Sequence, residues 1–101
     1  MLGQIAVGNV VLNRVASPEF PNTIWGVIFD RRYGVQFTPV ANGTVYATPT
    51  ESAVIAARLC LEGVTVSQRA LYFLNPAKAS SFWIVYNRPF AFRIGTHDFY
   101  N

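Results

Sequence analysis

The sequence predicts an α+β fold in which helices pack around a short β-hairpin. Two segments, 2–15 and 48–63, have apolar residues at the spacing of an α-helix. Between them, Asn42-Gly43 is flanked by stretches rich in β-branched and aromatic residues, and this pattern is the strongest short-range signal for a hairpin. Two aromatic runs nearer the C-terminus have the length and composition of strands.

The first predicted helix covers residues 2–15 and is apolar on almost every side. Ile5 and Leu12 share one side, and Val10 lies on the next. A helix that is apolar nearly all round is expected in a buried, central position. Gly8 within it costs about 1 kcal/mol relative to Ala, and a close approach by another element would account for that cost.

A loop is expected at 16–22, where two prolines interrupt the helical pattern. A short helix follows over 22–30, because Asn22 is a good capping residue and apolar residues recur at i, i+3 and i+4. These apolar residues are Ile24, Val27 and Ile28.

The Asn42-Gly43 pair predicts a hairpin turn, because both residues tolerate positive φ. The arms of this hairpin would be residues 35–40 and 44–48. Pro39 has no N–H to donate, so its arm should be an edge strand.

A second long helix is predicted over 48–63. Thr48 would be the N-cap and Pro49 the first helical residue, and Glu51 would complete a capping box. Gly63 would end the helix.

The C-terminal part is aromatic and less regular. Residues 70–74 are expected to form a short strand or an extended segment, Asn75-Pro76 a turn, and 97–100 a final short strand. Four side chains of the chain are assigned to packing: Phe37, Leu71, Phe73 and Trp83.

Charge is scarce in this chain. Only 13% of the residues are charged, against about 25% in an average domain, so the surface must be polar through uncharged side chains or leave apolar area open. The net charge of +3 comes mainly from scattered arginines, whereas nucleic-acid-binding proteins cluster theirs. We therefore expect no nucleic-acid partner, and a mild cationic excess suits an anionic polymer such as cell wall.

Neither a membrane span nor a metal site is expected. No apolar run reaches the roughly 18 residues of a span, and the apolar start lacks the basic leader and cleavage site of a signal peptide. Cys60, the single cysteine, should be a core residue. One cysteine and one histidine cannot build the usual zinc shell, so we expect no metal and no other cofactor.

The carboxylates offer no convincing pair for acid–base work on a glycosidic bond. Capping explains Glu51, while Glu62 near a helix end and Glu19 in a loop should be solvated. His97 and Asp98 would point to opposite faces of a strand. The single histidine is either a base near neutral pH or, as is more frequent, a structural residue.

Uncharged hydrogen-bonding and aromatic side chains remain, and they suit carbohydrate, because sugars offer C–H faces for stacking and hydroxyls for neutral partners. The alternative is that the tyrosines lie at the edge of the core with a hydroxyl in water. The set comprises Gln36, Thr38, Asn42, Tyr46, Tyr72, Asn75, Tyr86, Asn87 and Tyr100.

Four motifs in order resemble the spore-cortex-lytic and cell-wall hydrolases of the SleB/CwlJ type. They are "GQIAVGNVVLNRVASPEFPNTIWGVIF", "QFTPVANG", "ALYFLNPAKA" and "RIGTHDFY". The resemblance implies a lysozyme-like fold over a single domain, 1–101, and cleavage of the β-1,4 bond between N-acetylmuramic acid and N-acetylglucosamine in peptidoglycan. It also implies that "QFTPVANG" lines the glycan cleft. The residues chosen for that cleft are Gln36, Thr38, Tyr72, Asn75, His97 and Tyr100.

In the family, the catalytic glutamate lies in a segment of the type A-E-A-x-G-E just before the "GQ" motif, and no residue of this sequence matches it. We expect a domain truncated at its N-terminus relative to the family, with an apolar face that a homodimer or a partner chain would cover. Three hypotheses follow: a fragment of a lytic enzyme, a glycan-binding remnant without catalysis, or an interaction protein. An in-frame upstream continuation encoding the missing motif would establish the first. A spore, vegetative or phage setting stays open.

Overall fold

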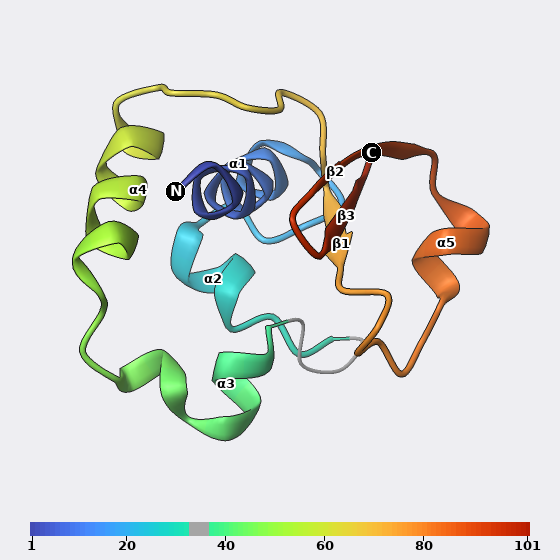
Figure 1. Cartoon of the computed structure of the whole chain (residues 1–101), viewed down its shortest axis with the longest axis horizontal. Helices are drawn as coiled ribbons and strands as arrows, with labels where there is room; N and C mark the ends of the chain where they lie inside the picture. The colour runs from blue at the N-terminus through green and yellow to red at the C-terminus, as the bar shows by residue number, and fades with distance from the viewer. Residues whose placement is uncertain (33–36) are drawn as a thin grey trace.

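A computed structural model describes residues 1–32 and 37–101 of the chain (Figure 1). Helix α1 (Leu2–Ala16) runs through the middle of the molecule, which confirms the predicted central helix. Among the described helices, none has both the length and the apolar character needed to cross a bilayer.

Helix α1 separates a helical side from a sheet side. It packs against α4 (Glu51–Leu61) and α2 (Ile24–Ile28) on one side and against β1 (Tyr72–Leu74) on the other (Figure 1). Its buried residues lie on several faces, as expected of a helix that is apolar nearly all round.

Gly8 is the point at which α1 and α4 come closest. A Cβ at this position would lie only 2.6 Å from Sγ of Cys60. The predicted close approach is therefore confirmed, and it explains a glycine in the middle of a helix. Cys60 is 6% exposed, which confirms it as a core residue, and burial raises the pKa of its thiol.

Three polar residues of α1 hold the extended segment 64–71 against the helix. Asn9, Asn13 and Arg14 lie at i, i+4 and i+5, and hydrogen bonds of 2.7–3.3 Å join them to backbone groups of that segment. Because these backbone groups lie outside any sheet or helix, side chains must satisfy them when they are buried. The partners are Val64, Val66, Ser67, Ala70 and Leu71.

The predicted short helix is confirmed as α2, but its cap is Thr23 rather than Asn22. The Thr23 hydroxyl accepts a hydrogen bond of 3.0 Å from the N–H of Gly26. Thr23 has the extended backbone angles of an N-cap. The first helical residue is therefore Ile24, one position later than it would be if Asn22 were the cap.

The predicted hairpin around Asn42-Gly43 is wrong. Residues 38–42 form helix α3 (Thr38–Asn42) and 44–46 form the 3₁₀ helix η1 (Thr44–Tyr46). Pro39 favours a helix start, because its φ is fixed and the N–H that it lacks has no partner there. Gly43 has φ 81° and ends α3. The other hairpin residues, 35 and 36, lie outside the described part.

The Asn42 side chain also favours two successive short helices over a hairpin. Its Oδ1 accepts hydrogen bonds from the N–H of Thr44 at 3.0 Å and from the Thr44 hydroxyl at 2.7 Å. The Asn42-Gly43 pair therefore links two short helices in this chain. The same dipeptide permits this geometry as well as a hairpin turn.

The hairpin of the molecule lies at the C-terminus instead. Strands β2 (Phe90–Ile94) and β3 (His97–Tyr100) pair antiparallel around the turn at Gly95 and Thr96. Strand β1 pairs with the other edge of β3, so the sheet order is β1-β3-β2. The strand or extended segment predicted at 70–74 is confirmed as β1, which begins at Tyr72, and the strand predicted at 97–100 is confirmed as β3. Strand β2 and helix α5 (Trp83–Asn87) were missed.

Helix α4 is confirmed, but it starts after Thr50 rather than Thr48. The Thr50 hydroxyl accepts a hydrogen bond of 3.2 Å from the N–H of Ala53. Glu51 is then the first helical residue and cannot form the predicted capping box, although its charge suits the N-terminal turn. Residues 47–50 are exposed, so no packing stabilises an earlier start. Gly63 follows the last turn with φ 98°, as predicted.

Within the described residues, two small clusters of buried side chains lie on the two sides of α1. Ala6, Val10, Ala70 and Phe99 form the cluster toward the sheet. The cluster toward α4 contains Ile5, Ala56 and Cys60, and half-buried Val66 packs against both clusters.

Candidate functional site

Tyr72 is the centre of a cluster of aromatic and arginine side chains that come from four segments. Its ring centroid lies 6.0 Å from that of Phe20 and 6.1 Å from that of Trp83. The guanidinium carbons of Arg14 and Arg88 lie 5.3 and 5.0 Å from the same centroid. We call these five residues the Tyr72 cluster. Such contacts fix the orientation of the ring without covering it entirely, since Tyr72 is half-buried.

Arg14 is the buried anchor of the cluster, with 4% of its surface exposed. Its Nε donates to the carbonyl of Leu71 at 2.7 Å, next to Tyr72, and its guanidinium carbon also lies over the rings of Phe20 and Phe37. One terminal nitrogen is buried without a hydrogen-bond acceptor in the described part of the chain. Burial lowers the pKa of Arg14, but a guanidinium remains charged in proteins.

Trp83 was expected to pack in the core, and this expectation is wrong. The side chain is 54% exposed, because α5 is a short helix at the edge of the sheet side (Figure 1). Its ring is therefore open to solvent beside the half-buried ring of Tyr72. The other three side chains assigned to packing, Phe37, Leu71 and Phe73, are half-buried.

The turn after β1 places Asn75 close to Tyr72 along the chain. Its Oδ1 accepts a hydrogen bond of 3.0 Å from the N–H of Ala77. Its side-chain amide nitrogen donates to no acceptor within the described residues, and the residue is half-buried. A donor is thus available three residues after Tyr72.

The sheet separates the remaining predicted residues. Tyr100 is the register partner of Tyr72 and shares its face, but it is 5% exposed and lies edge-on to Phe90. His97 lies on the opposite face, where its ring centroid is 5.9 Å from that of Phe73. Of the six residues predicted for the cleft, Gln36 lies outside the described residues, and only the backbone of Thr38, at the start of α3, is described.

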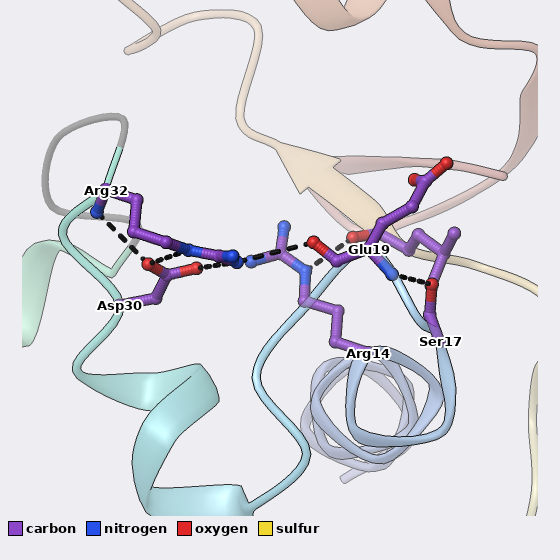
Figure 2. Close-up of polar contacts among 6 residues, drawn as sticks. Arg14, Ser17, Glu19, Asp30 and Arg32 are labelled. Carbon is purple, nitrogen blue, oxygen red and sulfur yellow. Dashed lines mark hydrogen bonds and ion pairs between the residues drawn. The ribbon is translucent and has the colours of Figure 1, made fainter.

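Asp30 forms the tightest ion pair near α1. Figure 2 shows Arg32 bound to this carboxylate and reaching the backbone of Glu19, with Arg14 beside them. The Arg32 Nε and terminal nitrogen lie 3.1 and 3.0 Å from the two Asp30 oxygens. Hydrogen bonds from Arg32 hold the pKa of Asp30 below its usual range, although burial opposes this shift. Such a carboxylate is a poor proton donor near neutral pH.

The remaining carboxylates do not converge on the Tyr72 cluster. Glu19, Glu51 and Glu62 are exposed, the first in a loop and the others at opposite ends of α4. Asp98 lies 3.6 Å from Nε of Arg93 across the β2–β3 hairpin. Within residues 1–32 and 37–101, no three His, Cys, Asp or Glu side chains gather closely enough to hold a metal ion.

Sequence reasoning missed both arginines of the cluster. One available signal was a basic residue in the last turn of an otherwise apolar helix, which is the position of Arg14. The other arginine, Arg88, follows α5. This helix has only five residues, which is too short for its apolar residues to show a helical period. Spatial proximity to Tyr72 is a property of the fold alone.

Comparison with known proteins gives a consistent result. The family model described as Cell Wall Hydrolase matches residues 1–100. The chain is 48% identical over 98 residues to a spore cortex-lytic enzyme of Bacillus cereus, covering 97% of this chain and 36% of that protein. It is 45% identical over 97 residues to the spore cortex-lytic enzyme of Bacillus subtilis, covering 96% and 30%. The chain thus spans about a third of the length of these curated relatives.

Two solved structures share the fold. The first is the catalytic domain of the germination-specific lytic transglycosylase SleB from Bacillus anthracis, with a TM-score of 0.86, 45% identity and coverage of 99% of this chain and 79% of that one. The second is the catalytic domain of the Bacillus cereus SleB protein, with a TM-score of 0.83, 46% identity and coverage of 99% and 75%. The predicted lysozyme-like α+β fold is confirmed by this similarity.

Proposed function

Because the chain belongs to the cell wall hydrolase family, we propose that it binds the glycan strands of peptidoglycan and cleaves the bond between N-acetylmuramic acid and N-acetylglucosamine by lytic transglycosylation. The proposal rests on one observation above all: nearly the whole chain superposes on the catalytic domain of a lytic transglycosylase. At 45% identity, the surfaces as well as the core are expected to correspond.

The Tyr72 cluster is the glycan-contacting surface in this proposal. Trp83 and Tyr72 offer aromatic faces for sugar rings, and the free amide nitrogen of Asn75 offers a neutral donor. Gln36 and Thr38 stay in the proposal as further polar contacts. His97 and Tyr100 contribute less to glycan binding in this proposal. His97 lies on the opposite face of the sheet from Tyr72, and Tyr100 is buried.

The proposed reaction needs one carboxyl group. That group protonates the glycosidic oxygen as its bond to C1 of the muramyl residue breaks, and the resulting carboxylate then takes the proton of the C6 hydroxyl as this hydroxyl attacks C1 of the same sugar. Because the attack is intramolecular, the effective molarity is high and no second carboxylate must hold a water. General acid–base help contributes typically about 10²–10⁴-fold.

We assign this role to none of the five carboxylates of the chain. Asp30 has a lowered pKa, Asp98 lies beside Arg93, and the three glutamates are exposed, one in a loop and two at opposite ends of α4. The residues named here therefore have a binding role, and a binder without catalysis is the alternative function.

Purified peptidoglycan sacculi test the proposal directly. Incubation followed by mass spectrometry should release muropeptides with 1,6-anhydro ends if the chain is a lytic transglycosylase. Co-sedimentation with sacculi without released products would support the glycan-binding alternative. Absence of both binding and products would refute the proposal and leave an interaction protein as the remaining hypothesis.

The proposed substrate implies an extracytoplasmic site of action, in the cell wall or the spore cortex. We also propose that a second copy or a partner chain covers the apolar side chains exposed on α1, α2 and α4, which are Leu2, Ile24, Trp25, Ile55 and Leu61. Analytical ultracentrifugation should then show a dimer or a stable complex, whereas a monomer at all concentrations would contradict this part of the proposal.

A further inference from the structure

The net charge of the chain resides entirely in its sheet half. Residues 1–62 contain four basic and four acidic residues and are neutral. Residues 63–101 contain four basic residues and one acidic residue, which gives the full +3. Their charged residues are Arg69, Lys78, Arg88, Arg93 and Asp98.

Two of these charges neutralise each other, because Asp98 lies 3.6 Å from Nε of Arg93. Arg88, in contrast, faces Tyr72 and has no carboxylate partner among the described residues. Its Nε donates to the carbonyl of Asn101 at 2.8 Å, which fixes the plane of the guanidinium. Its two terminal nitrogens donate to no described acceptor, so both remain available to a ligand.

Around Tyr72, this guanidinium is combined with an exposed aromatic ring. The guanidinium carbon of Arg88 lies 5.0 Å from the ring centroid of Tyr72, and the ring centroid of Trp83 lies 6.1 Å from it. Trp83 is the first residue of α5 and Arg88 is its C-cap, so both come from the same short segment of chain. Arg14 adds a second, buried cation 5.3 Å from the same centroid. A flat aromatic face beside a free guanidinium fork matches a sugar that bears a planar anion.

We infer that Tyr72, Trp83 and Arg88 form a subsite for an aminosugar that carries a carboxylate. This inference rests on the proposed function and specifies its substrate. N-acetylmuramic acid carries a lactyl group whose carboxylate is free or is extended by a peptide with a carboxylate of its own. The sugar ring lies against Trp83 and Tyr72, and the terminal nitrogens of Arg88 bind the carboxylate through two parallel hydrogen bonds.

The test uses three soluble glycan preparations and measures binding by isothermal titration calorimetry. The first consists of strands without peptides, with free lactyl carboxylates, the second of strands with short peptides, and the third of peptide-free strands with amidated carboxylates. We expect the native chain to bind the amidated strands at least about tenfold more weakly than their carboxylate form, because a hydrogen bond to a charged group is of that strength. The preferred member of the first two preparations identifies the source of the carboxylate.

Arg88→Gln should remove this preference: it should bind carboxylated strands about tenfold more weakly than the native chain does, and no more tightly than it binds amidated strands. Arg88→Lys keeps the charge but lacks the planar fork, so it should recover only part of the loss. Arg69→Gln, which removes an exposed arginine of the same half, is the matched control and should act only through net charge. Thermal unfolding followed by circular dichroism verifies that each variant is folded.

Equal binding of carboxylated and amidated strands by the native chain would overturn the inference while leaving the proposed function intact. Binding of neither preparation, with no release of products from sacculi, would instead refute the proposed function. A single-stranded oligonucleotide that competes as well as the glycan would show a general anion surface and would also overturn the subsite. Since amidation alters only the ligand, this comparison holds even if Arg88→Gln fails to fold.

Discussion

Replacing Gly8 by Ala tests how closely α1 and α4 pack. The new Cβ would lie 2.6 Å from Sγ of Cys60, well inside the roughly 3.5–4.0 Å of a favourable contact between non-bonded atoms. The sulfur has little freedom to move, because it is buried and lies 3.4 Å from the carbonyl of Ile5 and 3.7 Å from Nδ2 of Asn9. The helices must therefore separate at this point.

Two opposing terms determine the size of the effect. Alanine stabilises a helix interior by about 1 kcal/mol relative to glycine. Inserting a methyl group into a packed interface costs about 1–3 kcal/mol. We expect Gly8→Ala to lower the free energy of unfolding by about 1 kcal/mol, which corresponds to a decrease in Tm of about 4 °C or more for a chain of this size.

Urea titration followed by circular dichroism measures this change in the free energy of unfolding. The same substitution made in a Cys60→Ala variant tests whether the sulfur of Cys60 is the cause. In Cys60→Ala the sulfur is absent, and the nearest atom to the new methyl group is the Cβ of residue 60, at an ordinary 3.5 Å. Gly8→Ala should then be stabilising, by up to about 1 kcal/mol. If Gly8→Ala stabilises the native chain by the same amount, close packing is not the reason for the glycine and the reasoning fails.

Three further predictions concern the site and the caps. Tyr72→Ala should weaken binding to glycan strands by about tenfold in calorimetry and keep the helical circular dichroism, with Leu61→Ala as an exposed control; an unfolded variant would show that Tyr72 is a core residue. Thr50→Ala should cost about 1 kcal/mol in urea unfolding, whereas Thr48→Ala should cost little, and equal losses would contradict the observed cap. Asp30→Asn should lower stability at pH 7 by about 1–3 kcal/mol. Because the pKa of folded Asp30 is lowered, its contribution is fully present above the unfolded value of about 3.9 and is lost as the pH falls through the lower folded value, so the difference between the two proteins should shrink in acid; a pH-independent difference would exclude this linkage.

The polar residues of α1 illustrate why the site was harder to predict than the fold. Asn9 and Asn13 fall within the apolar pattern of the helix, and local sequence gives no indication of their partners. Those partners lie more than 50 positions further along the chain. The same holds for Arg14, which bonds to Leu71 and thereby places Tyr72. A contact between residues so distant in sequence is decided only when the chain has folded.

Trp83 and the Asn42-Gly43 pair show two different ways in which local patterns mislead. An aromatic run predicts burial, but whether a particular ring is covered depends on which elements lie beyond it, and none of those described covers Trp83. Asparagine followed by glycine permits positive φ, but that backbone geometry ends a helix as readily as it turns a hairpin. Pro39 and the Thr44 hydroxyl, both local, shift the balance toward helical turns.

By itself, the sequence determined the elements whose signals are local. The apolar periods of α1 and α4, the glycine after α4, the strand-like runs at β1 and β3 and the order of the family motifs are all present within short stretches of chain. Only the tertiary structure decided the cluster around Tyr72, the exposure of Trp83 and the hydrogen bond of Arg14 to the carbonyl of Leu71. The physical reason is that periodicity and capping depend on neighbours in sequence, whereas burial and contacts between distant segments depend on neighbours in space.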